Sequence, residues 1–110
     1  MLPTSHRMPR ELFEELLKRS QYANSLHFSL RFKVGAPHSR FGVSVSKKIS
    51  KSAVIRNSIR RRVYASLRDE IEHITPGLYL FMAKAGAGKI QGEKLVLEIQ
   101  GLLKSAKVIV

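Results

Sequence analysis

The stretch SKKISKSAVIRNSIRRRVYASLR, residues 46–68, determines most of what can be inferred about the fold of this chain. It holds eight Lys or Arg residues and no Asp or Glu, so its charges repel one another and do not favour a compact structure. An apolar series with a spacing of four runs through it and just beyond it: Ile55, Ile59, Val63, Leu67 and Ile71. Side chains four residues apart share one face of an α-helix. The spacing therefore predicts an amphipathic helix over about residues 52–73, with its apolar side packed against a sheet.

The residues on the other side of this helix predict a cationic surface. Arginine offers a planar fork that matches phosphate oxygens, and a tyrosine among the arginines adds a ring on which a base can stack. Lysines just before the helix lie near exposed backbone N–H groups, which themselves attract anions. A solvated charged face is the plain alternative, but a face of a single sign favours binding. The predicted RNA-binding residues are Lys47, Lys48, Lys51, Arg56, Asn57, Arg60, Arg61, Arg62, Tyr64 and Arg68.

The charge of the whole chain supports a polyanionic partner. The net charge is +12 and the pI is near 10.6, which is typical of nucleic-acid-binding domains. No acidic residue lies between Leu16 and Arg68, whereas 13 of the 20 basic residues do, so the positive charge belongs to one face. The length of 110 residues predicts a single domain over residues 1–110, and its charge predicts that this is a nucleic-acid-binding domain, with RNA as the expected partner. Residues 1–8 are expected to form a flexible basic tail that includes Arg7.

Composition also excludes several classes of protein. The chain has no cysteine, which excludes a disulfide scaffold and a cysteine-based zinc site. No apolar run approaches about 18 residues, and the N-terminus lacks the apolar core of a secretory signal. We therefore expect a soluble, cytoplasmic protein with no membrane partner.

The flanking segments predict an α+β fold, a small mixed sheet packed by helices. Residues 9–20 read as a helix, and residues 26–34 and 40–46 alternate as two strands expected to pair antiparallel. Residues 78–85 form a largely apolar run, which is expected to be a strand buried on both faces. Because this strand follows the central helix, it would complete a βαβ-like unit. Residues 92–110 are expected to form the last helix, with its core side made by Leu95, Ile99, Leu102 and Leu103.

No catalytic group is predicted. The sequence suggests no paired carboxylates, no Ser–His–acid set and no acidic metal cage, and the four histidines lack ligand spacing. The GAGK stretch at residues 86–89 lacks the spacing of a phosphate-binding loop and reads as a plain loop. We expect neither catalytic nor metal-binding side chains in this chain.

The string RFGVSVSKKISKSAVIRNSIRRRVYASLR, residues 40–68, resembles the signature of the bacterial ribonuclease P protein subunit. That family shows a glycine-containing strand, a Ser-Lys-Lys turn, and then Ala-Val, Arg-Asn and basic residues on a helix. The matching positions here are Gly42, Ser46, Lys47, Lys48, Ala53, Val54, Arg56, Asn57, Arg60, Arg61 and Arg68. Ser58 and Tyr64 stand where the family usually has a basic residue.

The resemblance implies a ribosomal-protein-like α/β sandwich with a left-handed βαβ crossover. It implies that the basic helix binds the catalytic ribonuclease P RNA. It further implies that the 5′ leader of precursor tRNA lies in a groove on the open sheet face, where Phe13, Ser29 and Arg31 map. Mg²⁺ held mainly by the RNA would carry the hydrolysis, and the protein would act as an accessory subunit. No DNA partner is expected.

Two other functions compete with this one. A ribosomal or other structural RNA-binding protein would use the same basic helix. A peripheral membrane protein would need large apolar residues at the membrane surface, whereas the apolar stripe here is better used as core. Substitution of Arg61 is expected to weaken RNA binding, and substitution of Arg7 in the tail is expected to do much less.

Overall fold

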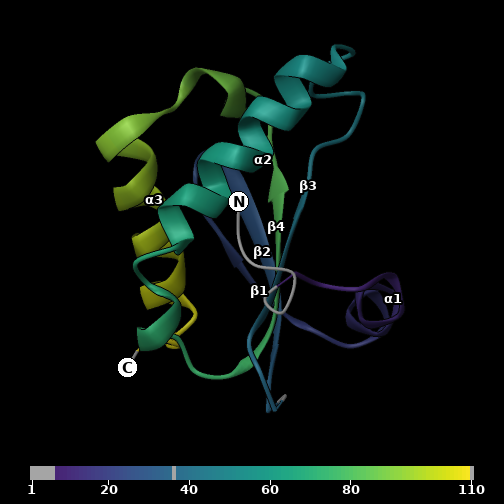
Figure 1. Cartoon of the computed structure of the whole chain (residues 1–110), viewed down its shortest axis with the longest axis vertical. Helices are drawn as coiled ribbons and strands as arrows, with labels where there is room; N and C mark the ends of the chain where they lie inside the picture. The colour runs from purple at the N-terminus through teal and green to yellow at the C-terminus, as the bar shows by residue number, and fades with distance from the viewer. Residues whose placement is uncertain (1–6, 36, 110) are drawn as a thin grey trace.

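The computed structural model describes residues 7–35 and 37–109. Four strands form one mixed sheet in the order β1-β2-β4-β3, and they span β1 (Gln21–Asn24), β2 (Phe28–Val34), β3 (Arg40–Ser44) and β4 (Gly77–Ala83). Helices α2 (Ala53–Leu67) and α3 (Gly92–Ser105) cover one face, and α1 (Arg10–Lys18) crosses the other (Figure 1). Two short 3₁₀ turns, η2 (Ile71–His73) and η3 (Ala87–Lys89), complete the chain. The predicted α+β class is confirmed.

β4 takes the central position in the sheet. It pairs antiparallel with β2 and parallel with β3, so the predicted direct pairing of residues 26–34 with residues 40–46 is wrong. Tyr79 and Phe81 are buried among the residues that face α2 and α3, and Leu78 and Leu80 are buried beneath α1. A strand that buries both faces belongs inside a sheet. Alternation along the two earlier strands predicts which side chains point inward, but it does not specify the neighbouring strand.

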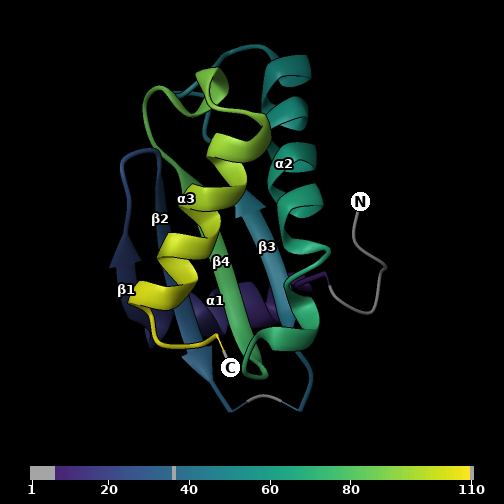
Figure 2. The ribbon, with the colours of Figure 1, turned by 90° about the vertical axis from the view of Figure 1, so that its left-hand side faces the viewer.

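The connection from β3 through α2 to β4 is left-handed. Figure 2 shows both strands running upward with α2 in front of the sheet and β4 to the left of β3. Parallel strands are joined almost always by right-handed crossovers, in which the second strand would lie to the right. The crossover that the resemblance implies is therefore present.

The central helix is shorter than the predicted span of 52–73. It ends at Leu67, after which the chain tightens into i→i+3 hydrogen bonds, such as that from Glu70 N to Leu67 O at 2.9 Å. This turn takes Ile71 out of the helical stripe and leaves it half-buried. At the other end Ile55 is 48% exposed. The stripe that reaches the core consists of Ile59, Val63 and Leu67, each at most 1% exposed.

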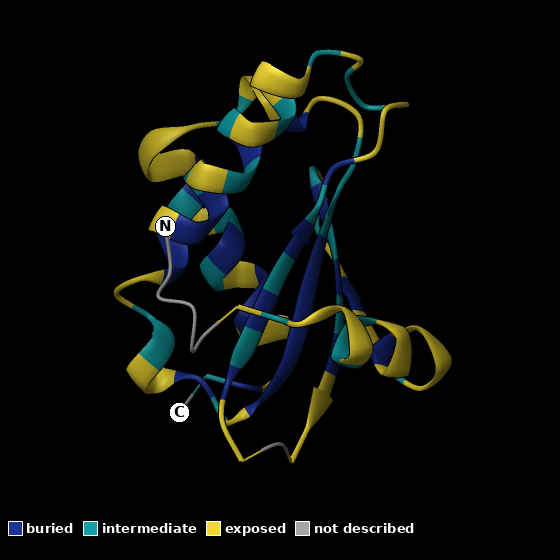
Figure 3. Ribbon diagram, turned by 45° about the vertical axis from the view of Figure 1, so that its right-hand side comes forward, coloured by how far each residue is buried: buried dark blue, intermediate teal, exposed yellow. Residues whose placement is uncertain are grey.

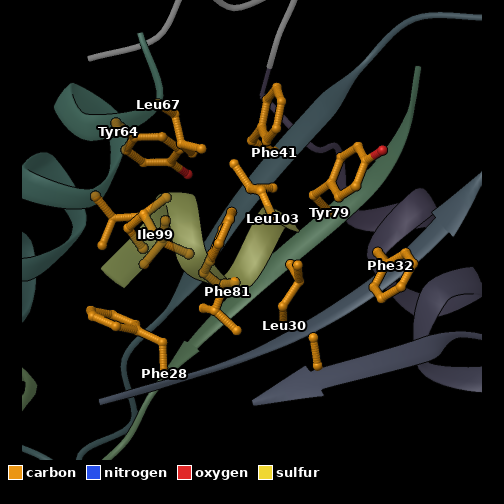
Figure 4. Packing of buried hydrophobic residues seen from close by; sticks show 14 of the residues in the cluster. Phe28, Leu30, Phe32, Phe41, Tyr64, Leu67, Tyr79, Phe81, Ile99 and Leu103 are labelled. Atoms are coloured by element: carbon orange, nitrogen blue, oxygen red, sulfur yellow. The ribbon is translucent and has the colours of Figure 1, made fainter. Parts of the chain in front are cut away.

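Aromatic side chains fill the centre of the core (Figure 4). Tyr79 stacks between Phe41 and Phe32, with ring centroids 5.4 Å and 6.3 Å away, and its hydroxyl donates to the carbonyl of Thr75. Burial raises the pKa of Tyr79 to about 12, so the hydroxyl remains a donor at neutral pH.

The terminal elements differ in part from the prediction. The four core residues predicted for the last helix are buried in α3, but α3 ends at Ser105, because Lys107 adopts a left-handed conformation with φ of 60°. Strand β1 was not predicted. Arg7 forms a parallel bridge with Phe41, and Met8 N donates to Phe41 O at 2.9 Å. These two residues are therefore fixed to the sheet rather than part of a loose tail; residues 1–6 of the predicted tail lie outside the described residues.

Candidate nucleic-acid interface

Helix α2 is held in place by its apolar stripe and by a cap at its first turn. Ser52 is the N-cap residue, and its hydroxyl accepts a hydrogen bond from Ile55 N at 3.3 Å. Figure 3 shows buried residues on the side of α2 that faces the sheet and exposed residues along its outer side. Packing of the stripe offsets the repulsion among the arginines, which all project from this one helix.

Two of the arginines organise the helix start. Arg56 Nη1 donates to the carbonyls of Ser50 at 2.9 Å and Lys51 at 3.0 Å. Arg60 Nη1 donates to Asn57 Oδ1 at 2.8 Å. These bonds limit the motion of both guanidinium groups while their charges stay at the surface. A cation fixed in this way binds an anion with less loss of conformational entropy.

The side chains of Arg61 and Arg68 are exposed and make no hydrogen bond or ion pair with other residues in the ranges 7–35 and 37–109. Within those ranges the carboxylates that form ion pairs are Glu98, with His27, and Glu15, with Lys33. No arginine of α2 is neutralised by a carboxylate of the described chain. The outer face of α2 therefore keeps its full positive charge.

The lysines predicted for the site lie in the turn between β3 and α2. Lys47, Lys48 and Lys51 are all exposed there, next to the N-terminal end of the helix. The positive end of the helix dipole and three mobile ammonium groups thus attract anions at the same place.

Arg62 lies on the other flank of α2. Its Nη1 donates to the carbonyl of Gly88 at 2.9 Å, which ties α2 to the η3 turn. The side chain is half-buried. Arg62 is therefore set apart from the other arginines, and its contact within the chain positions η3 against the helix.

Tyr64 does not project outward as predicted. It is 9% exposed and packs in the core cluster, so its ring offers no free platform for a stacked base. Burial raises the pKa of Tyr64, whereas a backbone hydrogen bond with Val43 and the charges of Arg7 and Arg60 act in the opposite direction. On a helical wheel Tyr64 lies about 60° from Leu67. A large ring at the border of an apolar stripe can reach the sheet below, and here it does.

A shallow depression of about 570 Å³ follows this edge of the helix. Its walls come from α2, except for one residue from the segment before α1, which the sequence did not indicate as part of a site. The lining residues are Arg7, Val54, Asn57, Arg60, Arg61 and Tyr64.

A second polar surface lies on the opposite face of the sheet. The strand register places Asn24, Ser29, Met82 and Ser44 in one row across all four strands. Ser29 Oγ donates to Asn24 Oδ1 at 2.9 Å. On this face Phe13 of α1 and Met82 of β4 both pack against the buried cluster of Leu16, Leu78 and Leu80. Ser29, Arg31 and Phe13, which the resemblance assigned to the leader groove, therefore share one face.

Arg31 lies in the next row, between Tyr22 and Leu80. Its guanidinium lies 4.7 Å from the centroid of the Tyr22 ring, and its Nη1 donates to the carbonyl of Leu17 at the end of α1 at 3.3 Å. Its Nε is buried and lacks a hydrogen-bond partner among the described residues. Tyr22 and Asn24 were missed by sequence reasoning, because β1 is too short to show a clear alternation.

Within residues 7–35 and 37–109, no group of three His, Asp or Glu side chains gathers closely enough to hold an ion. In the same ranges no helix is long and apolar enough to cross a bilayer.

The fold and these two surfaces define a small basic α+β domain of the nucleic-acid-binding class. A family model described as Ribonuclease P matches residues 2–107. The chain belongs to the ribonuclease P protein family.

Relatives from cyanobacteria agree with this assignment, and each is called a ribonuclease P protein component. The protein of Rippkaea orientalis is 32% identical over 98% of this chain and 91% of its own length, and that of Synechococcus sp. is 33% identical over 100% and 88%. The match to Microcystis aeruginosa is shorter: 38% identity over 72 residues, which is 64% of this chain and 60% of that protein.

Solved structures show the same fold. The RNase P protein of Staphylococcus aureus superposes with a TM-score of 0.85 at 25% identity, covering 96% of this chain and 98% of that one. The Thermotoga maritima protein gives a TM-score of 0.79 at 21% identity over 89% and 94% of the two chains, which supports the fold alone.

Proposed function

We propose that this chain is the protein component of ribonuclease P, which binds the ribonuclease P RNA through α2 and the 5′ leader of precursor tRNA on the open sheet face. Membership of the family makes it part of an RNA-cleaving enzyme complex that processes tRNA. The observation that carries the proposal is the outer face of α2, where exposed arginines have no carboxylate partner in the described chain.

The helix binds folded RNA by charge. Guanidinium groups spaced about one turn apart meet phosphate groups and release the counterions condensed on them. Binding through phosphates is strong at low salt and depends little on sequence. Such contacts suit a protein whose partner is recognised by its folded shape.

The sheet face binds a single strand. Ser29 and Asn24 supply hydrogen-bonding groups, Arg31 supplies charge, and Phe13 supplies an aromatic surface at the edge. Single-stranded RNA is generally held by such a combination of stacking and backbone contacts. The protein then raises the affinity for a precursor with a leader over mature tRNA, which lacks one.

We assign the hydrolysis to the RNA and to Mg²⁺ bound by it. The described side chains do not fit a magnesium cage, since no three of their His, Asp or Glu residues lie close enough together to hold an ion. The residues of this chain bind and orient the two RNA molecules, and none of them is assigned a chemical step.

Reconstitution tests the proposal. The purified chain alone should leave precursor tRNA intact, and addition of the cognate ribonuclease P RNA should give cleavage at the mature 5′ end at low Mg²⁺. The proposal is wrong if the protein changes neither the cleavage rate of that RNA nor its Mg²⁺ requirement. Sedimentation with ribosomal subunits after a high-salt wash would instead support a ribosomal protein.

A further inference from the structure

We infer that Arg7 is an RNA-binding residue, and that it completes a composite phosphate site with Arg60 and Arg61 of α2. This inference rests on the proposed function of the α2 face. It joins two segments of the chain that lie more than fifty positions apart in the sequence.

The backbone of Arg7 is fixed beside the helix. Arg7 forms a parallel bridge with Phe41 of β3, Met8 N donates to Phe41 O at 2.9 Å, and Arg40 Nη1 approaches Arg7 O at 3.5 Å. β3 is the edge strand of the sheet and lies beneath α2. Through this bridge Arg7 lies beside the outer edge of β3, and its side chain lies next to α2.

The side chain of Arg7 shares a depression with the arginines of α2. The depression is lined by Arg7, which precedes α1, and by Asn57, Arg60, Arg61 and Tyr64 of α2. Arg7 and Arg60 are both close enough to act electrostatically on the Tyr64 hydroxyl. Since Tyr64 is almost completely buried, it gives this part of the site a rigid surface.

The chemistry of this site favours the phosphate groups of an RNA strand. Three guanidinium groups line one depression, and none of the described residues that line it carries a carboxylate. Like charges held together raise the energy of the free protein, and an anion placed between them relieves the repulsion. Asn57 holds Arg60 by a bond of 2.8 Å, so this part of the site is ordered in advance. The depression is open and wide, which suits successive phosphates of a folded polynucleotide rather than one small enclosed anion.

The test is the salt dependence of binding to the ribonuclease P RNA alone. Each phosphate contact contributes about one unit to the slope of log affinity against log salt. Arg7→Ala should flatten this slope by about one unit, as Arg61→Ala should. Arg10→Ala is the matched control: Arg10 is also an exposed N-terminal arginine, but it lies on α1, which packs on the opposite face of the sheet, and the slope should stay at the wild-type value.

A second variant separates charge from fold. Arg7→Lys keeps the charge and should keep the wild-type slope. The bridge to Phe41 uses backbone atoms, and the Tm of each variant measures whether the fold is kept. The inference is overturned if Arg7→Ala leaves the slope unchanged while Arg61→Ala flattens it, or if Arg7→Lys loses as much slope as Arg7→Ala. Failure of the wild-type protein to bind this RNA would instead overturn the proposed function.

Discussion

The outer face of α2 and the open face of the sheet are both polar, but they are built in opposite ways. The helix face draws most of its residues from one continuous segment, and its charges have one sign. The sheet face draws one residue from each of four strands, and its charges are balanced or held in place: Lys33 pairs with Glu15 at 3.0 Å, and Arg31 is bound at the end of α1. A surface of unpaired charge suits a large folded polyanion, whereas a compensated surface with small polar groups suits selection among single strands.

The largest expected effect concerns the stripe that supports the helix face. Ile59→Ala should lower the free energy of unfolding by about 2–5 kcal/mol, because it leaves a cavity under α2. Ile55→Ala belongs to the same periodic series but lies at a half-exposed position, so it should cost less than about 1 kcal/mol. Urea unfolding of both variants measures the difference. Equal losses of stability in the two variants would show that Ile55 also packs in the core, and that the buried stripe is not limited to Ile59, Val63 and Leu67.

The next largest effect concerns the turn between β1 and β2, which Glu98 of α3 holds in place. Glu98 of α3 accepts hydrogen bonds from Ser25 Oγ at 2.5 Å and from His27 N at 2.8 Å, and pairs with His27 Nδ1 at 2.7 Å. Burial alone would raise the pKa of Glu98, but the bonds from Ser25 and His27 outweigh it and lower the pKa below its ordinary value of 4.5. Glu98→Gln should lower the free energy of unfolding by about 1–3 kcal/mol at neutral pH.

The pH dependence of that effect has a definite sign. Because the folded-state pKa of Glu98 lies below 4.5, its stabilisation is present in full above pH 4.5 and is lost as the pH falls through the folded-state pKa. Wild type and Glu98→Gln should therefore converge in stability in acid. Glu93→Gln, at an exposed position of the same helix, should lose much less stability than Glu98→Gln at neutral pH. A gap between wild type and Glu98→Gln that widens in acid would contradict this account.

A smaller effect should separate the two faces in function. Arg31→Ala should reduce the preference of the reconstituted enzyme for precursor over mature tRNA by about tenfold, since a charge-assisted contact contributes about 1.5 kcal/mol. It should leave the affinity of the protein for the ribonuclease P RNA unchanged. The test measures two quantities separately: the affinities of the assembled enzyme for precursor and mature tRNA, and the affinity of the protein for the ribonuclease P RNA. A loss of assembly with no loss of precursor preference would place Arg31 on the wrong surface.

The smallest expected effect compares two arginines of the helix face. Arg61→Ala should flatten the salt dependence of RNA binding by about one unit. Arg56→Ala should change the slope less, because Arg56 is half-buried, whereas Arg61 is exposed, and its Nη1 is directed to the carbonyls of Ser50 and Lys51 rather than to solvent. Titrations at several salt concentrations give both slopes. An equal change for the two would show that only total charge matters on this face.

Sequence reasoning succeeded where the information is local. A spacing of four predicts α2 and three of its buried residues, Ile59, Val63 and Leu67, and alternation predicts most of the side chains of β2 and β3 that point inward. The same reasoning failed for Tyr64, because the wheel gives an angle but not the reach of a large side chain towards the sheet. It failed for the pairing of β2 with β3, because β4 arrives between them only after α2 is complete. Arg7 was missed because nothing in its neighbourhood shows that it bridges to Phe41.

The central position of β4 has a consequence for how the chain acquires its activity. β2 and β3 share no hydrogen bonds with each other, and residues 77–83 supply the ladder that joins them. A growing polypeptide can form helical turns around its arginines early, but it cannot assemble the sheet until this late strand is inserted. The two surfaces that we propose bind RNA therefore arise together, in a single cooperative step, and a chain truncated before Gly77 would possess neither.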